Sequence, residues 1–399
     1  MKSHRTKSEQ LKTLRFQHIY LENWRNFVKI DVDLQRRMFF VGPNASGKSN
    51  FLDVFRFLHD IASVIGGGLQ NSVQKRGGVS SLRALAARKY SDIKIKIGVG
   101  TEQEPLIWEY EVHFTQDNLR RPILKKERVA KRGQDILSRP DDQDREDPER
   151  LTQTSLEQVN INKDFRELVD FLAAIRYLHI VPQLVREPNR SVGKRNDPYG
   201  GDFLELIART SEQTQKAWLR RIQSALSIAV PQLKEIELKR DDHGTPHLRG
   251  KYSHWRSEGA WQTEEQFSDG TLRLLGLLWA ILDGTGPLLL EEPELSLHPE
   301  VVRYLPQIFA RVQRRTGRQI LLSTHSVDLL RDEGIGLDEV IVLLPTGEGS
   351  EAKIVKNIKD MQQLLSDGGI SLPEIVISQT RPERAEQLML FGDSVNGSR

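Results

Sequence analysis

Apolar and polar residues alternate along the first part of the chain, as they do in strands with one buried face. The segments RFQHIYLENW, FVKIDVDL and RMFFV predict strands within residues 15–41, and IKIKIGVG and LIWEYEVHF predict two more at 93–100 and 106–114. Between them, SNFLDVFRFLHDIASVI has apolar residues at helical spacing and ends at the glycines 66–68. The sequence therefore predicts a β-rich lobe around one helix.

The middle of the chain is less regular. Residues 125–155 contain the basic run KKERVAKR and the charged run RPDDQDREDPER, which predict a surface loop or a disordered connection. Helical segments are predicted near 163–176 and 202–228, with a loop rich in proline, glycine and arginine between them. At 1.5 Å per residue these helices reach only about 20 and 40 Å. The insert is therefore expected to be a compact helical lobe, not a long coiled coil.

The last part has a dense α/β pattern. An apolar helix begins at Leu272, and the short strands LLLE and QILLS follow, with a helix between them. The predicted fold class is α/β, with a β-rich N-terminal lobe, a mostly parallel sheet and a helical insert lobe. The predicted parts are an N-terminal head portion (1–120), the insert lobe (121–255), a C-terminal head portion (256–380) and a polar tail (381–399).

Composition excludes several classes of protein. The 399 residues include no cysteine, which excludes disulfides and thiolate metal sites and fits the reducing cytoplasm. The formal net charge is only +3, so no strongly basic coat for nucleic acid is expected. The N-terminus MKSHRTKSEQ lacks the apolar core of a secretory signal. The longest apolar run, Leu274–Leu282, is far shorter than the ~20 residues of a membrane span. We expect a cytoplasmic protein without a membrane partner.

One segment matches the phosphate-binding pattern G-x-x-x-x-G-K-[ST] at every position. It lies between a predicted strand and a predicted helix, and Asn50 continues it into that helix. Its glycines permit a tight loop whose N–H groups face a phosphate at the helix N-terminus. The lysine would lie between the β- and γ-phosphates, and the serine hydroxyl would bind Mg²⁺. The loop consists of Gly42, Pro43, Asn44, Ala45, Ser46, Gly47, Lys48 and Ser49.

Polar residues follow two of the predicted strands. Glu291 and Glu292 come after an apolar run, and His325 follows the next strand. Ligands bind at the carboxyl ends of the strands in open α/β sheets. Glu291 is the candidate Mg²⁺ ligand, and Glu292 is the candidate base for the attacking water. His325 is a candidate donor to the γ-phosphate. By themselves, the two glutamates could also be surface residues and the histidine a polar strand end.

A fourth motif, FSDGT, stands at the head of the apolar helix. Ser268 and Asp269 are good helix caps, and Gly270 permits close approach of another backbone. The helix N-terminus could face an anion. Taken alone, the motif also fits an ordinary capped helix.

The order of these motifs resembles the ATP-binding-cassette (ABC) ATPases. It most resembles the branch that holds the structural-maintenance-of-chromosomes (SMC) proteins, RecF and the overcoming-lysogenization-defect (OLD) nucleases. The similarity covers residues 15–60 and 264–330 well and the middle poorly. LENWRNF resembles the N-terminal strand motif of that branch, in which the arginine, here Arg25, reaches the nucleotide phosphates. EEPELSLHP resembles its Walker B motif and D-loop, closely so in standalone AAA-family ATPases of bacteria and archaea without a Toprim nuclease domain.

The resemblance implies a P-loop NTPase fold of ABC type that binds ATP and Mg²⁺ and forms a dimer. Two heads would enclose two ATP molecules. Ser268 and Gly270 would then touch the γ-phosphate of ATP held by the loop of the second copy. Leu295–His298 would lie across the dimer seam.

Three positions depart from the usual family pattern. The signature reads SDGT, so Asp269 must point away from the γ-phosphate or pair with a cation such as Arg273. Glu291 replaces the usual aspartate and could bind the metal more loosely. Gln183 is the candidate for the glutamine that senses Mg²⁺ and water, with Gln74 as the alternative, and a simple surface glutamine is the competing interpretation of either.

Basic residues in the insert could hold DNA phosphates, although a solvated surface is the alternative. They are Lys125, Lys126, Arg128, Lys131 and Arg132, followed by Arg186, Arg190, Lys194 and Arg195. The segment after His325 is too short and too poor in acids for a Toprim nuclease, so a separate effector chain such as a nuclease is expected. Leu388–Phe391 could dock a partner or fold back onto the head.

These features favour a dimeric ATPase switch that acts on or near DNA, in bacterial genome maintenance or anti-phage defence. A nucleotide-gated scaffold that hydrolyses little ATP and holds an effector is the alternative. The nucleotide-binding subunit of a membrane transporter is disfavoured by the Arg25 strand motif, the insert and the signature.

Overall fold

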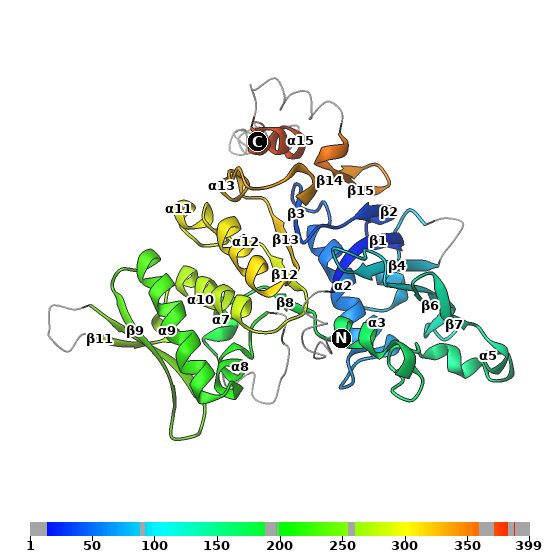
Figure 1. The fold of residues 1–399 in the computed structure, drawn as a ribbon, viewed down its shortest axis with the longest axis horizontal. Coiled ribbons are helices and arrows are strands. Elements are labelled where there is room, and N and C mark those ends of the chain that lie inside the picture. Colours follow the sequence, from blue (N-terminus) through cyan, green and yellow to red (C-terminus); the bar gives the residue numbers. More distant parts are fainter. Residues whose placement is uncertain are drawn as a thin grey trace, which may run out of the picture.

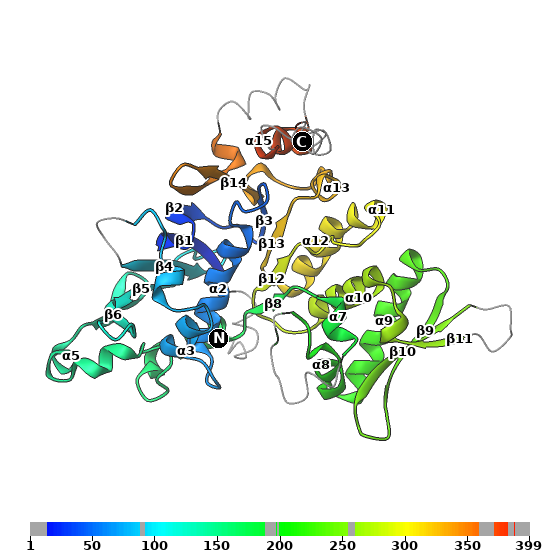
Figure 2. The same cartoon turned by 180° about the vertical axis from the view of Figure 1, so that it is seen from behind.

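The computed structural model describes residues 14–87, 92–187, 197, 199–253, 260–358, 371–381 and 387. Figures 1 and 2 show a central parallel sheet with the N-terminal lobe on one side and the insert lobe on the other. The predicted basic residues Arg190, Lys194 and Arg195 lie outside the described residues, as do Leu388–Phe391 and most of the predicted tail.

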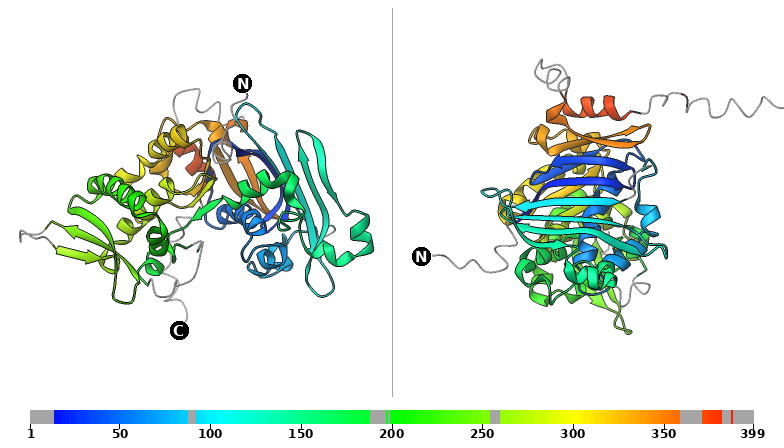
Figure 3. Two further views of the ribbon diagram at one scale, coloured as in Figure 1. Left: turned by 60° about the horizontal axis from the view of Figure 1, so that its bottom comes forward. Right: turned by 90° about the vertical axis from the view of Figure 1, so that its right-hand side faces the viewer.

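The N-terminal lobe is built on a six-stranded antiparallel sheet of order β2-β1-β4-β5-β6-β7, whose strands run side by side in Figure 3. Its alternating residues bury one face against α2. The strands are β1 (Arg15–Trp24), β2 (Phe27–Asp33), β4 (Ile93–Gly100), β5 (Trp108–Gln116), β6 (Pro122–Lys131) and β7 (Gln134–Arg139). The helices of this lobe are α2 (Lys48–Ala62), α3 (Leu69–Gln74), α4 (Val79–Leu82), α5 (Asp142–Glu146) and α6 (Arg166–Ala173), with the short turns η1 (Pro148–Thr152) and η2 (Asn162–Phe165).

The prediction of a loop over residues 125–155 was wrong. β6 and β7 complete the first sheet, and α5 and η1 follow them. The charged residues are ordered because they pair within the lobe. Arg139 is buried and reaches Glu127 at 3.3 Å and Asp144 at 2.7 Å. Burial would raise the pKa of Asp144, but the hydrogen bonds from Arg139 and from the backbone of Asp141 lower it to about 2.

The second sheet has the order β15-β14-β3-β13-β12-β8. It is parallel from β14 to β8, and only β15 runs antiparallel to its neighbour. Its strands are β3 (Arg37–Val41), β8 (Arg176–Leu178), β12 (Leu288–Glu291), β13 (Ile320–Thr324), β14 (Val340–Thr346) and β15 (Gly349–Ile354). Glu291 pairs with Ser323, and Thr324 pairs with Val41, so the predicted motifs begin at one edge of this sheet.

The insert lobe is less helical than predicted. Its helices are α7 (Pro182–Val185), α8 (Phe203–Arg209) and α9 (Glu212–Ala229), so the predicted long helix is interrupted at Thr210 and Ser211. A three-stranded sheet of order β11-β10-β9 covers α9, with β9 (Leu233–Arg240), β10 (Pro246–Tyr252) and β11 (Ala260–Thr263). Sequence analysis missed these strands because their many charged residues mask the alternation. α10 (Asp269–Leu282) joins this lobe to the second sheet.

The remaining elements cover the outer face of the second sheet and the chain that follows it. They are α11 (Pro299–Val302), α12 (Leu305–Thr316), α13 (Val327–Leu330), η5 (Leu337–Glu339), η6 (Val355–Asn357) and α15 (Leu372–Thr380). The short turn η4 (Glu264–Gln266) instead contacts β10 and β11 of the insert lobe. Within the described residues, no helix combines the length and the apolar character needed to cross a membrane.

Candidate functional site

The phosphate loop connects β3 to α2, as predicted. Gly47 has φ +97°, and a Cβ atom there would lie 2.2 Å from the Asn26 side chain. A Cβ atom on Gly42 would lie 2.6 Å from the carbonyl oxygen of Leu343. Both glycines are therefore required by the left-handed backbone or by close packing. The loop is held in a shape that a side chain at either position would disturb.

Asn26 holds the loop from outside, a role that sequence analysis did not identify. It lies in the two-residue turn between β1 and β2. Its amide nitrogen donates to the Ser46 carbonyl oxygen at 3.0 Å and to the Ser350 hydroxyl at 2.9 Å. Its amide oxygen accepts from the side chain of Asn50 at 2.8 Å. Asn26 thus connects the loop, α2 and β15, which are distant in the sequence.

The side chain of Lys48 is buried against the first residues of the phosphate loop. Its Nζ atom donates to the carbonyl oxygens of Gly42 at 3.0 Å and Pro43 at 3.2 Å and lies 4.0 Å from Oε1 of Glu292. Burial lowers the pKa of Lys48, and the carboxylates of the neighbouring glutamates oppose this shift. A buried ammonium favours an anionic ligand because its own solvation is incomplete.

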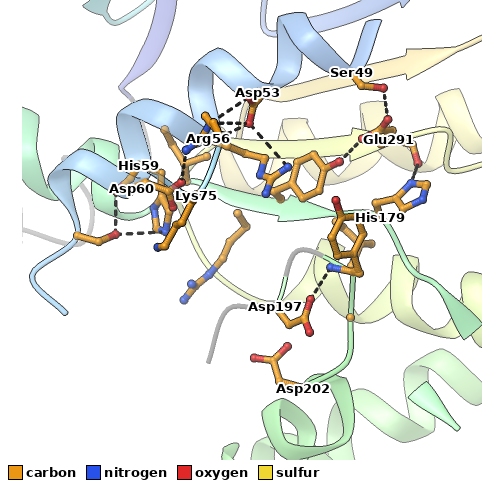
Figure 4. A pocket seen from close by; sticks show the side chains of 18 of the residues that line it. Ser49, Asp53, Arg56, His59, Asp60, Lys75, His179, Asp197, Asp202 and Glu291 are labelled. Atoms are coloured by element: carbon orange, nitrogen blue, oxygen red, sulfur yellow. Dashed lines mark hydrogen bonds and ion pairs between the residues drawn. The ribbon is translucent and has the colours of Figure 1, made fainter. Parts of the chain in front are cut away.

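Ser49 and Glu291 meet directly. The Ser49 hydroxyl donates to Oε1 of Glu291, and the Tyr177 hydroxyl donates to Oε2. Figure 4 shows Ser49 and Glu291 facing each other, with His179 on the other side of the glutamate. The ring of His179 lies 3.4 Å from the Glu291 carbonyl oxygen. Burial and the adjacent carboxylate raise the pKa of Tyr177 well above its usual value, so its phenol remains a donor.

Glu292 and His325 also lie together. Nδ1 of His325 is 3.2 Å from Oε1 of Glu292, and Glu292 has a left-handed backbone with φ 44°. Such a conformation is costly for a residue with a side chain and is often found at functional sites. Glu294, which sequence analysis did not single out, accepts from Thr324 at 2.6 Å and from the His325 backbone at 3.3 Å. It thereby ties the segment after β12 to the end of β13.

The loop fits the triphosphate and Mg²⁺ that a P-loop fold implies. Among the described residues, Ser46 is the only residue from Ala45 to Ser49 whose N–H donates to a protein carbonyl, that of Pro43 at 3.2 Å. The other N–H groups are available to a phosphate at the start of α2. The described residues contain no cluster of three metal-binding His, Asp or Glu residues. The pair Ser49 and Glu291 suits Mg²⁺, which usually keeps waters and phosphate oxygens as its other ligands.

The signature residues lie on a different element from the loop. The Ser268 hydroxyl caps α10 by accepting from the Thr271 N–H at 3.2 Å. Asp269 pairs with Arg186 at 2.6 Å. The prediction was that Asp269 points away or pairs with a cation such as Arg273, and the cation is Arg186, the residue that follows α7. A Cβ atom on Gly270 would lie 2.4 Å from the carbonyl oxygen of Ser296, so the signature packs closely against the predicted D-loop.

The remaining predicted residues lie farther from these groups. Arg25 pairs with Asp53 of α2 at 3.0 Å. Burial would raise the pKa of Asp53, but Arg76, Arg56 and Arg25 keep it below its usual value. Gln183 is exposed on α7, a few residues after β8, and Gln74 is exposed at the end of α3. Their roles at the nucleotide stay predictions.

A cleft of about 670 Å³ opens beside the loop. α2, the residues that follow α3, β8 and the segment leading into α8 line it, and Ser49 and Glu291 also belong to its lining (Figure 4). Charged residues of both signs line the cleft, including Asp53, Arg56 and Asp60.

The comparisons with known proteins agree with this geometry. The chain matches the family described as "AAA domain, putative AbiEii toxin, Type IV TA system" over residues 37–332. A search of curated proteins finds no match.

Three solved structures resemble the fold. The Smc head domain with an extended coiled coil from Pyrococcus furiosus, bound to the C-terminal domain of ScpA, has a TM-score of 0.53 and 11% identity, over 88% of this chain and 100% of that chain. An SmcHead bound to the C-winged helix domain of ScpA has a TM-score of 0.54 and 12% identity, over 87% and 99%. The Smc head domain with a coiled coil and joint from Pyrococcus yayanosii has a TM-score of 0.50 and 11% identity, over 90% and 100%. The predicted P-loop NTPase fold is thus confirmed, and the chain belongs to this AAA-domain family, with the ABC-type ATPase fold of an SMC head.

Proposed function

We propose that this protein is a dimerising switch that hydrolyses ATP to ADP and phosphate. One observation carries the proposal. Lys48, Ser49, Glu291, Glu292 and His325 come from three separate segments and meet at one edge of the second sheet. Each belongs to a residue type that phosphoryl transfer requires: a cation, a metal-binding pair, a base and a donor.

The residues divide the work as follows. The loop from Gly42 to Asn50 holds the phosphates, and Lys48 neutralises charge between them. Ser49 and Glu291 hold Mg²⁺, which supplies electrostatic stabilisation of the transferred phosphoryl group when it is bound. Glu292 orients the attacking water and accepts its proton, and His325, 3.2 Å from Glu292, positions that carboxylate and can donate to the γ-phosphate.

The second half of each site comes from another copy of the chain. In support, Ser268 and Asp269 are occupied with α10 and Arg186, and no hydrogen bond or ion pair between described residues links them to the phosphate loop. Gly270 and Ser296 hold the signature and the D-loop together as one surface. Binding of ATP would join this surface to the loop of the partner, and hydrolysis would release it.

We place this switch with a separate effector chain. The matched family description names a toxin of a toxin–antitoxin system, and two of the similar Smc heads carry a bound ScpA domain. Action on DNA, in genome maintenance or anti-phage defence, rests on the resemblance to the SMC branch. The basic run of β6 gives it little support. Lys126 pairs with Glu111, Arg128 with Asp135, and Arg132 with Glu104.

The proposal is tested with purified protein, ATP and Mg²⁺. We expect multiple turnover by the wild type, and a loss of about 100-fold or more with Lys48→Ala or Glu292→Gln. Light scattering should show Glu292→Gln as a dimer with ATP and as a monomer without it, because binding is retained while hydrolysis is blocked. Unchanged turnover in either variant contradicts the assigned roles.

A nucleotide-gated scaffold is the competing function. Glu291 favours it, because the carboxylate of this longer acid accepts hydrogen bonds from two hydroxyl groups of the chain itself. A scaffold would dimerise with ATP but show no multiple turnover, with or without its effector. Turnover by the isolated wild-type chain rules it out.

A further inference from the structure

We propose that Tyr177 is a positioning residue that holds Glu291, the Walker B acid, in place for Mg²⁺. The inference rests on the proposed function and deepens it. It also accounts for a glutamate at a position where the family pattern has an aspartate.

Strand register brings the two residues together. β8 is parallel to β12, and Tyr177 pairs with Leu289. Leu289 and Glu291 are two residues apart on one strand, so their side chains lie on the same face of the sheet. Tyr177 and Leu289 belong to the core beside α2, which also carries Ser49. The long tyrosine side chain reaches along this face, and its hydroxyl donates to Oε2 of Glu291.

The two oxygens of Glu291 therefore have different donors. Ser49 donates to Oε1 from α2, and Tyr177 donates to Oε2 from β8. A glutamate has one more rotatable bond than an aspartate, so its carboxylate is harder to hold in one orientation. A donor on the oxygen away from Ser49 fixes that rotation and leaves the Oε1 side facing the loop. Groups that orient a metal ligand in this way commonly change metal affinity or activity when removed.

The phenol ring is itself held. The guanidinium of Arg56 lies over the ring, 4.3 Å from its centroid. Nη1 of Arg56 lies 3.8 Å from Asp53, one turn back on α2. Tyr177 is half-buried in the wall of the cleft, so Phe can replace it without a cavity. The hydroxyl is then the only group removed.

The experiment measures Mg²⁺ dependence in Tyr177→Phe. A fluorescent ATP analogue is titrated into the protein at increasing Mg²⁺, and turnover is measured over the same range. We expect the half-saturating Mg²⁺ concentration to rise about tenfold, with analogue binding in EDTA unchanged. Tyr199→Phe is the matched control, because Tyr199 lines the same cleft and no hydrogen bond between described residues joins it to Glu291. It should behave as the wild type.

A double-mutant cycle with Glu291→Asp tests whether Tyr177 affects Mg²⁺ dependence through Glu291. The shorter acid cannot reach the phenol, so adding Tyr177→Phe to Glu291→Asp should change Mg²⁺ dependence less than twofold. Independent effects would overturn the inference, as would an unchanged Mg²⁺ requirement in Tyr177→Phe. If Tyr177→Phe does not fold, Glu291→Asp alone tests the same bond, and a wild-type Mg²⁺ requirement in it overturns the inference. Absence of turnover in the wild type would contradict the proposed function only, because the binding titration still tests Tyr177.

Discussion

The phosphate loop and the signature are both short motifs at helix N-termini, but they differ in which parts of the chain contact them. The loop is the meeting point of many segments: Asn26, Glu291 and Glu292 all reach it from elsewhere in the chain. The signature residues bond within their own lobe, where Ser268 caps α10 and Asp269 pairs with Arg186, the residue that follows α7. In the proposed dimer, one copy of the chain would thus present a nearly complete site and, on a separate surface, the part that the site of its partner lacks.

This difference teaches how the switch can be reversible. The loop residues form contacts that do not depend on a second chain, so ATP can bind before the dimer forms. In the proposed dimer, the signature surface would gain a ligand only when the partner brings its ATP. Association would then depend on the γ-phosphate, and its removal by hydrolysis would favour separation.

The largest effect is expected when the loop half of the site is inactivated in one chain and the signature half in another. Ser268→Arg should reduce turnover about 100-fold because it blocks the signature, while ATP still binds to the phosphate loop of the variant. Lys48→Ala should be equally inactive, because it damages the phosphate loop and leaves the signature intact. Mixed in equal amounts, the two inactive proteins should recover roughly one quarter of wild-type turnover, because half the dimers are mixed and each has one intact site.

Steady-state ATPase assays of each variant and of the mixture measure this recovery. Lys48→Ala mixed with Glu292→Gln is the matched control and should stay inactive, because both changes damage the loop half. No recovery in the first mixture would show that the signature does not act in trans.

A smaller effect is expected from Asn26→Ala, which loosens the loop without touching its motif. Three side-chain hydrogen bonds are lost, so ATP affinity should fall about tenfold and the free energy of unfolding by about 1–3 kcal/mol. Isothermal titration and urea unfolding measure the two quantities. Asn71→Ala, an exposed asparagine on α3, is the control. Equal losses in both variants would contradict a special role for Asn26.

Arg186→Ala changes the signature half without blocking it, so a smaller loss of turnover is expected than with Ser268→Arg. It leaves Asp269 without its partner at 2.6 Å, and the uncompensated carboxylate should repel the γ-phosphate of the partner's ATP. Turnover should fall about fivefold, with ATP binding to the loop unchanged. Asp269→Asn in the same chain should restore most of it. Failure of that restoration would assign the effect to lost packing of α7 on α10.

The smallest difference is expected between the two candidate glutamines. Gln183 follows β8, which ends beside Leu290 and so near Glu291, whereas Gln74 is the last residue of α3 in the N-terminal lobe. Gln183→Ala should lower the maximal rate about threefold, and Gln74→Ala should not change it. Rate measurements at saturating ATP and Mg²⁺ compare the two. The opposite ranking would move the role to Gln74.

Features carried by adjacent residues could be predicted from the sequence. The loop from Gly42 to Ser49, the strand before it and the helix after it depend on local spacing, and the structure has all three. The apolar strands β12 and β13 and the two acids at the end of β12 were found for the same reason. Such motifs depend on backbone angles and periodicity, which neighbouring residues largely set.

Pairings between residues far apart in the chain could not be predicted from the sequence. Nothing in the charged run after residue 125 indicates that Arg139 will be buried with Glu127 and Asp144, so an ordered strand pair was mistaken for a loop. In the same way, the hydroxyl of Tyr177 meets Glu291 only because β8 lies beside β12. Whether a charged or polar side chain is exposed or paired depends on which strand becomes its neighbour. That neighbour is selected by packing of the whole core, not by the residues adjacent in the chain.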